Sequence, residues 1–193
     1  MIFHAVRGEL TREQVIKLGL LEPDADVTLG DAGILAPFLL DNMPPKRYFC
    51  GIVPHVADYG LPCVVRTQDK IRNSVVINVR EDPLKVLEQM ASCEMILASA
   101  MHGLIVADAL GIPNQWVRFS DNPQIGGFGD RFKYHDYYSI FPGYPHEPIK
   151  PDAVMKSFIP ERFITQFNPR TEIVRMTQQS LLECAGKMKE VLG

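Results

Sequence analysis

Ser99, His102 and Gly103 lie in a short turn between an apolar segment, residues 93–98, and an apolar helix-forming segment, residues 103–110. The first N–H groups of a helix lack partners within the helix and carry partial positive charge. A strand, a tight turn and a helix in this order therefore present N–H donors and an imidazole at one edge of a sheet. This combination suits a small molecule with a phosphate or carboxylate group.

Within this turn, each of the three residues has an expected role. Ser99 is expected to be the N-cap, so that its hydroxyl accepts a hydrogen bond from the backbone N–H of Met101 or His102. His102 would project from the first helical turn as an anion ligand or proton donor. Gly103 would leave room for a ligand to approach the backbone.

Arg7, Asp31 and His55 each follow a short apolar run, at the point where a strand is expected to end. In open α/β sheets, ligands bind outside the carboxyl ends of the strands, so these side chains are candidates for the same site. Each also has a structural interpretation. Arg7 can pair with Glu9 or Asp31, Asp31 can be a turn residue, and His55 can hydrogen-bond only its own loop.

Extended and helical patterns alternate along the chain and predict an α/β, Rossmann-like parallel sheet with flanking helices and a carboxyl-terminal helix. Thr11 and Gln14 have the spacing of a capping box, and Asp82 precedes Pro83 as an N-cap precedes a first helical residue. We expect a ligand-binding domain over residues 1–150 and a helical extension over residues 151–193. Residues 126–129, rich in glycine, are expected to form a mobile loop or lid. The expected elements are extended segments at residues 2–6, 26–29, 47–53, 74–79, 93–98 and 114–119, and helices at 11–18, 83–91, 103–110 and 171–192.

Composition excludes several classes of protein. The chain has 193 residues, 46% hydrophobic and 22% charged, which is typical of a globular protein. A net charge of −3 without a dense basic block argues against nucleic acid as a partner. Apolar runs are too short to span a membrane, and the four cysteines lack the spacing of a metal site or disulfide framework. We expect the protein in the cytoplasm, where a peripheral position at the inner face of the membrane is one option. We expect no bound metal.

The segment from Ser99 to Pro113 resembles the signature of the polysaccharide pyruvyl transferases, in particular the exopolysaccharide ketal-pyruvate transferases. Shorter matches lie in the same order as in that family, and the resemblance covers roughly residues 5 to 140. These matches are Val6–Arg7–Gly8, Leu29–Gly30–Asp31, Gly51–Ile52–Val53–Pro54–His55, and Lys133 with Asp136–Tyr137–Tyr138.

The resemblance implies transfer of pyruvate from phosphoenolpyruvate to two hydroxyls of a cell-surface saccharide or its lipid-linked precursor, which forms a cyclic ketal. It implies a fold similar to one half of a GT-B glycosyltransferase and no cofactor beyond phosphoenolpyruvate as co-substrate. His102 and Arg7 would be catalytic, and Ser99, Gly103, Asp31 and His55 would bind substrate. Many members have Arg where Ala100 stands, and Arg118 is a candidate substitute.

The family is usually longer, so the resemblance places this chain as the carboxyl-terminal, donor-binding half. A missing amino-terminal half or a homodimer would then cover an exposed apolar face. Two alternatives remain open at this point. One is a glycosyltransferase or epimerase half that binds a nucleotide sugar, and the other is a non-catalytic scaffold of polysaccharide assembly.

Overall fold

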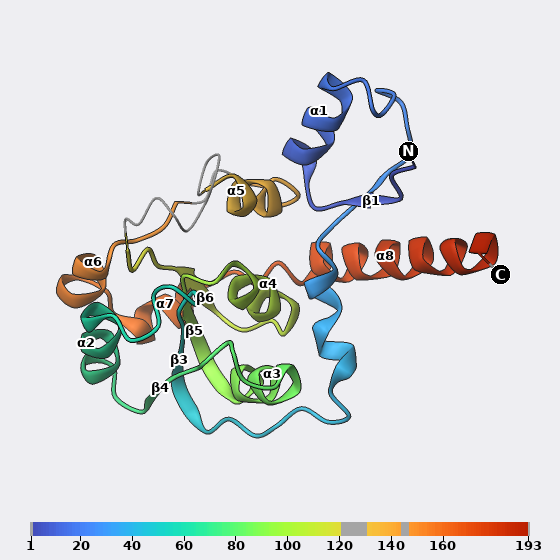
Figure 1. Ribbon diagram of the computed structural model, residues 1–193. Coiled ribbons are helices and arrows are strands. Elements are labelled where there is room, and N and C mark those ends of the chain that lie inside the picture. Colours follow the sequence, from blue (N-terminus) through green and yellow to red (C-terminus); the bar gives the residue numbers. More distant parts are fainter. Residues whose placement is uncertain (1, 121–130, 144–146, 193) are drawn as a thin grey trace.

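The computed structural model describes residues 2–120, 131–143 and 147–192 (Figure 1). Residues 126–129, expected to form a loop, lie outside this part. The strands are β1 (Ala5–Val6), β2 (Thr28–Leu29), β3 (Tyr48–Val53), β4 (Ser74–Val76), β5 (Cys93–Ala98) and β6 (Asn114–Trp116). The helices are α1 (Glu9–Lys17), the 3-10 helix η1 (Ala32–Leu39), α2 (Pro62–Lys70), α3 (Pro83–Ala91), α4 (Met101–Ala109), α5 (Phe132–Tyr138), α6 (Pro151–Lys156), α7 (Pro160–Gln166) and α8 (Thr171–Leu192).

The main sheet is parallel, with strand order β4-β3-β5-β6. A second, two-stranded parallel sheet joins β1 to β2, with Val6 paired to Leu29. Helices lie on both faces of the main sheet: α2, α6 and α7 on one side, and α3, α4 and α8 on the other (Figure 1). The predicted α/β, Rossmann-like fold with a carboxyl-terminal helix is confirmed.

Alternate residues of the central strands separate the core into two clusters. Ile52 and Leu97 belong to the cluster under α2 and α6, whereas Val53 and Ile96 belong to the cluster under α3 and α4. This alternation follows from the two-residue period of a strand, and both faces are apolar because both are covered. The carboxyl-terminal helices join these same cores, but the predicted boundary after residue 150 stays a prediction.

The amino-terminal helix α1 begins earlier than the sequence predicted. Its N-cap is Gly8, so the capping box expected from Thr11 and Gln14 is wrong. Thr11 instead donates hydrogen bonds from its backbone N–H and its hydroxyl to the buried carboxylate of Asp136 in α5, at 2.7 and 2.6 Å. A Cβ on Gly8 would lie 1.8 Å from the carbonyl oxygen of Asp136. Long-range docking therefore decides where α1 starts.

The start of α3 and the span of α8 agree with the sequence. The Asp82 carboxylate accepts hydrogen bonds from the backbone N–H groups of Leu84 and Lys85, which confirms Asp82 as the N-cap of α3. Helix α8 spans Thr171–Leu192, as its periodicity predicted. Within the described residues, no helix is both long and apolar enough to cross a membrane.

The four cysteines are free thiols in two different environments. Cys50 and Cys93 are buried in the core, and burial raises the pKa of Cys93 to about 12. Because the thiolate is the nucleophile, we expect iodoacetamide at pH 8 to leave Cys50 and Cys93 unmodified in the folded protein. Mass spectrometry should find label on Cys63 and Cys184 first, and on all four in urea. Modification of Cys50 before unfolding would contradict this burial.

Candidate functional site

The turn between β5 and α4 lies at the carboxyl edge of the main sheet, as predicted, but the role of Ser99 in this turn differs from the prediction. Ala100 is the N-cap of α4, so the assignment of Ser99 to that position is wrong. The Ser99 hydroxyl accepts a hydrogen bond from the backbone N–H of His55 at 2.9 Å and donates one to Asp58 at 2.5 Å. Its partners lie on the neighbouring loop because β3 and β5 are adjacent parallel strands. Ser99 therefore joins two loops at the sheet edge.

Gly103 also has a packing role that the sequence did not indicate. A Cβ at Gly103 would lie 2.9 Å from Cγ1 of Val53 and 3.1 Å from Cβ of Ala98. The missing side chain thus lets α4 approach the sheet closely. Helix α4 is buried nearly all round, as expected from its apolar sequence. This packing fixes the backbone of the first turn of α4, from which the side chain of His102 projects.

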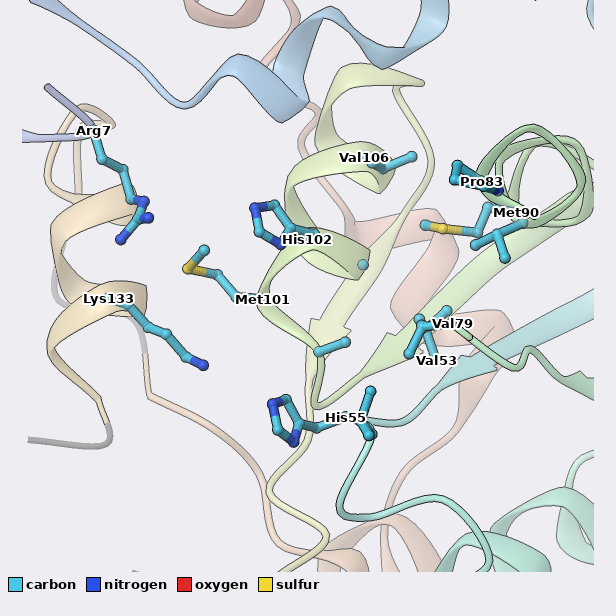
Figure 2. Close-up of a pocket in the computed structure, with 14 residues that line it drawn as sticks. Arg7, Val53, His55, Val79, Pro83, Met90, Met101, His102, Val106 and Lys133 are labelled. Carbon is cyan, nitrogen blue, oxygen red and sulfur yellow. The ribbon is translucent and has the colours of Figure 1, made fainter. Parts of the chain in front are cut away.

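His102 extends from this turn into an open cavity of about 560 Å³, and its side chain is 69% exposed. Figure 2 shows Arg7 and Lys133 approaching His102 from one side, with His55 below and an apolar wall opposite. No carboxylate lines this cavity among the described residues. The lining consists of Arg7, Val53, His55, Val56, Val79, Pro83, Val86, Met90, Ala100, Met101, His102, Gly103, Val106 and Lys133.

Asp31 lies beside both Arg7 and His102. Its Oδ2 accepts a hydrogen bond from Nε of Arg7 at 2.8 Å, and its Oδ1 lies 3.8 Å from Nε2 of His102. The same Oδ1 accepts from the backbone N–H of Gly33, which makes Asp31 the N-cap of η1. The side chain of Asp31 is only 10% exposed. Arg7 and Asp31 meet because β1 and β2 pair in parallel and end at the same level.

His55 lines the cavity at the end of β3. Burial lowers the pKa of His55, the positive charge of Lys133 lowers it further, and Asp58 acts in the opposite direction. Asp58 is 3% exposed and accepts hydrogen bonds from the hydroxyls of Ser99 and Ser120. The burial of Asp58 could not be predicted from the sequence, since an aspartate in a loop carries no local signal of burial.

The structure thus brings Arg7, His55, His102 and Gly103 to one cavity, with Asp31 and Ser99 directly behind it. Arg118 follows β6 and its Nε donates to the carbonyl of Ser120, but it does not line the cavity. Lys133 of α5 supplies a cationic side chain there. Its place could be anticipated only from the family resemblance, since it is remote from the turn in sequence. Whether these residues bind substrate stays a prediction.

Within the described residues, no group of three histidine, cysteine or acidic side chains lies together as in a metal site. The arrangement can instead bind an anion, because guanidinium, ammonium and imidazole groups converge beside a helix N-terminus. The fold and cavity define a Rossmann-like α/β domain with a cavity at the carboxyl ends of its strands, lined in part by the cationic side chains of Arg7 and Lys133.

Comparison with known proteins places this domain more closely. A model of the polysaccharide pyruvyl transferase family matches residues 3–118, so the chain belongs to the polysaccharide pyruvyl transferase family. An uncharacterized protein of Acanthamoeba polyphaga mimivirus is 36% identical over 141 residues, which cover 72% of this chain and 47% of that protein. The matched part thus spans about half the length of this relative. No solved structure matches the chain.

Proposed function

We propose that this chain binds phosphoenolpyruvate in the cavity between Arg7, His102 and Lys133, as the donor-binding part of a pyruvyl transferase. The observation that carries the proposal is a cavity with cationic side chains, a helix N-terminus and no carboxylate in its described lining. Phosphoenolpyruvate bears a phosphate and a carboxylate, and both need such donors. Membership of the family supports pyruvate transfer as the reaction.

The proposed reaction has two stages. A proton is added to the methylene carbon of phosphoenolpyruvate, and a hydroxyl of the acceptor saccharide attacks the neighbouring carbon. The bond between this carbon and the phosphate oxygen breaks, phosphate leaves, and a second hydroxyl of the same saccharide closes the ketal. Of the two protons that the hydroxyls lose, one replaces the proton added to the methylene carbon and the other goes to phosphate. His102 is the proposed proton donor or phosphate ligand, and Arg7 the proposed partner of the carboxylate or phosphate. General acid catalysis typically contributes about 10²–10⁴-fold, and preorganised charge more.

The proposal also includes a GT-B-like arrangement in the complete enzyme and a setting in the cytoplasm or at the inner face of the membrane. A further domain, a partner chain or a second copy would supply the acceptor side. The adjacent apolar residues Phe38 and Leu39 at the end of η1 are both exposed, and such a partner would cover them.

Calorimetric titration of the full chain with phosphoenolpyruvate, and separately with uridine diphosphate, tests the proposal. We expect saturable binding of phosphoenolpyruvate, and at least tenfold weaker binding by His102→Ala, which corresponds to about 1.4 kcal/mol. His4→Ala is the matched control, because His4 is exposed and does not line the cavity.

Each other outcome has a distinct meaning. Preference for uridine diphosphate would favour a nucleotide-sugar enzyme in place of a pyruvyl transferase. Binding of neither ligand to folded protein would contradict donor recognition by this chain and favour a scaffold. Equal affinity of wild type and His102→Ala would remove His102 from the site.

A further inference from the structure

His55 is held at the sheet edge by hydrogen bonds on both sides of its backbone. Its N–H donates to the hydroxyl of Ser99 at 2.9 Å, and its carbonyl accepts from the N–H groups of Asp58 and Tyr59 at 2.8 and 3.1 Å. Ser99 belongs to the turn after β5, whereas Asp58 and Tyr59 belong to the loop of His55 itself. The imidazole therefore starts from a backbone that is fixed relative to the cavity.

A buried carboxylate stabilises this anchor. Asp58 accepts hydrogen bonds from the hydroxyls of Ser99 and Ser120 at 2.5 and 2.6 Å, one on each carboxylate oxygen. Ser99 thus donates to Asp58 and accepts from His55 through a single hydroxyl. Because buried polar groups are costly when unpaired, this set of bonds resists rearrangement.

The ring of His55 has one nitrogen already in use. The backbone N–H of Ala57 donates to Nδ1 of His55, with a nitrogen–nitrogen distance of 3.3 Å. A nitrogen that accepts a hydrogen bond carries a lone pair and no proton, so the proton of the neutral ring is on Nε2. Protonation of Nδ1 would place its N–H against the backbone N–H of Ala57, and this hydrogen bond would be lost.

Burial and a nearby positive charge also favour the neutral form of the His55 ring. Burial and the ammonium group of Lys133 on α5 both disfavour a positive imidazole, and together they lower the pKa of His55 against the weaker influence of Asp58. Figure 2 shows the side chain of Lys133 extending towards His55. Charge and hydrogen-bond geometry therefore agree on a neutral ring at neutral pH.

We propose that His55 is a neutral hydrogen-bond donor, fixed as the Nε2–H tautomer, that binds an oxygen of the ligand and does not transfer protons. The two histidines of the cavity then have different roles. His102 projects from α4 beside the carboxylate of Asp31, with no bond that fixes its tautomer among the described residues. His55 adds a donor without adding charge beside Lys133, which separates ligand orientation from proton delivery.

The tautomer is measurable in the free protein, so this part of the proposal is independent of the ligand. Long-range ¹H–¹⁵N correlation spectra of the full chain at pH 7, assigned by comparison with His55→Gln, should show a proton on Nε2 and a bare Nδ1. A protonated Nδ1, in the other tautomer or in an imidazolium, would overturn the proposal.

The role in binding rests on the proposed function and is tested with phosphoenolpyruvate. The amide nitrogen of Gln can occupy the position of Nε2 and donate a hydrogen bond, but it cannot carry a proton between groups. We expect His55→Gln to bind within about threefold of wild type and His55→Ala about tenfold more weakly, as for one hydrogen bond to a charged oxygen. Equal weakening in both variants would overturn the donor role. If wild type does not bind phosphoenolpyruvate, the proposed function fails while the spectra still decide the tautomer.

Discussion

Replacement of Asp108 by alanine is expected to lower the free energy of unfolding by about 3–5 kcal/mol. The Asp108 side chain is 1% exposed, and its two oxygens have three partners from three parts of the chain. Asn114 and Arg170 each donate to Oδ1 at 2.8 Å, and the hydroxyl of Tyr137 donates to Oδ2 at 2.9 Å. Asp108→Ala removes all three bonds and leaves a cation behind.

Arg170 is the reason that the expected loss is large. Its side chain is 19% exposed, and its guanidinium lies 5.2 Å from the ring centres of both Tyr138 and Phe141. Without Asp108, this charge stays in an aromatic environment and has no other carboxylate partner among the residues that the structure describes. Removing one member of such a buried ion pair lowers the free energy of unfolding more than replacing both charged residues.

Urea unfolding followed by circular dichroism measures this effect. Asp69→Ala is the matched control, because Asp69 lies exposed on α2, and it should change stability by no more than about 0.5 kcal/mol. Replacing both members of the pair, in Asp108→Leu with Arg170→Met, should cost less than Asp108→Ala alone. A loss below about 1 kcal/mol in Asp108→Ala would show that the ion pair does not hold these helices together.

Asp108 also shows where sequence reasoning stops. The carboxylate lies within the segment that resembles the family signature, yet nothing in its local pattern indicates partners at Tyr137 and Arg170. Both partners are distant in sequence and reach Asp108 only when α5 and α8 pack beside α4. Patterning predicted the parallel sheet, the apolar α4 and the long α8 because those features depend on local periodicity.

In the candidate site too, the positions set by local pattern were predictable and the contacts set by tertiary packing were not. Strand ends predicted the positions of Arg7, Asp31 and His55, because parallel strands present their carboxyl ends at one edge. The partners of Ser99 were not predictable, since the choice between its own helix and the neighbouring loop depends on the distance between β3 and β5. The start of α1 at Gly8 likewise depends on a tertiary contact with α5.

Arg7→Met is expected to weaken phosphoenolpyruvate binding by roughly 10- to 100-fold, as for the loss of charge-assisted hydrogen bonds of about 1.5–3 kcal/mol. Arg7 uses Nε to bind Asp31, and its terminal nitrogens make no other hydrogen bond within the described part of the chain. Figure 2 shows the side chain pointing towards His102 and the cavity. The fork of the guanidinium is therefore available to an anion.

Arg7→Lys should recover little of this loss. An ammonium group is a point charge and cannot bind Asp31 through one nitrogen while presenting two more to a ligand. Lys17→Met is the control, since Lys17 is an exposed cation on α1 that does not line the cavity. Calorimetry in low salt gives the affinities, and full binding by Arg7→Met would exclude Arg7 from the anion site.

A double-mutant cycle then separates Arg7 from its carboxylate partner. If Asp31 acts by orienting the guanidinium, Asp31→Ala weakens binding in the wild-type background but has little further effect in Arg7→Met. If Asp31 instead acts through His102, at 3.8 Å, the effect of Asp31→Ala persists when Arg7 is absent. Oδ2 of Asp31 accepts a hydrogen bond from Arg7 at 2.8 Å, whereas Oδ1 already accepts one from Gly33. We therefore expect most of the effect of Asp31→Ala on binding to disappear when Arg7 is replaced.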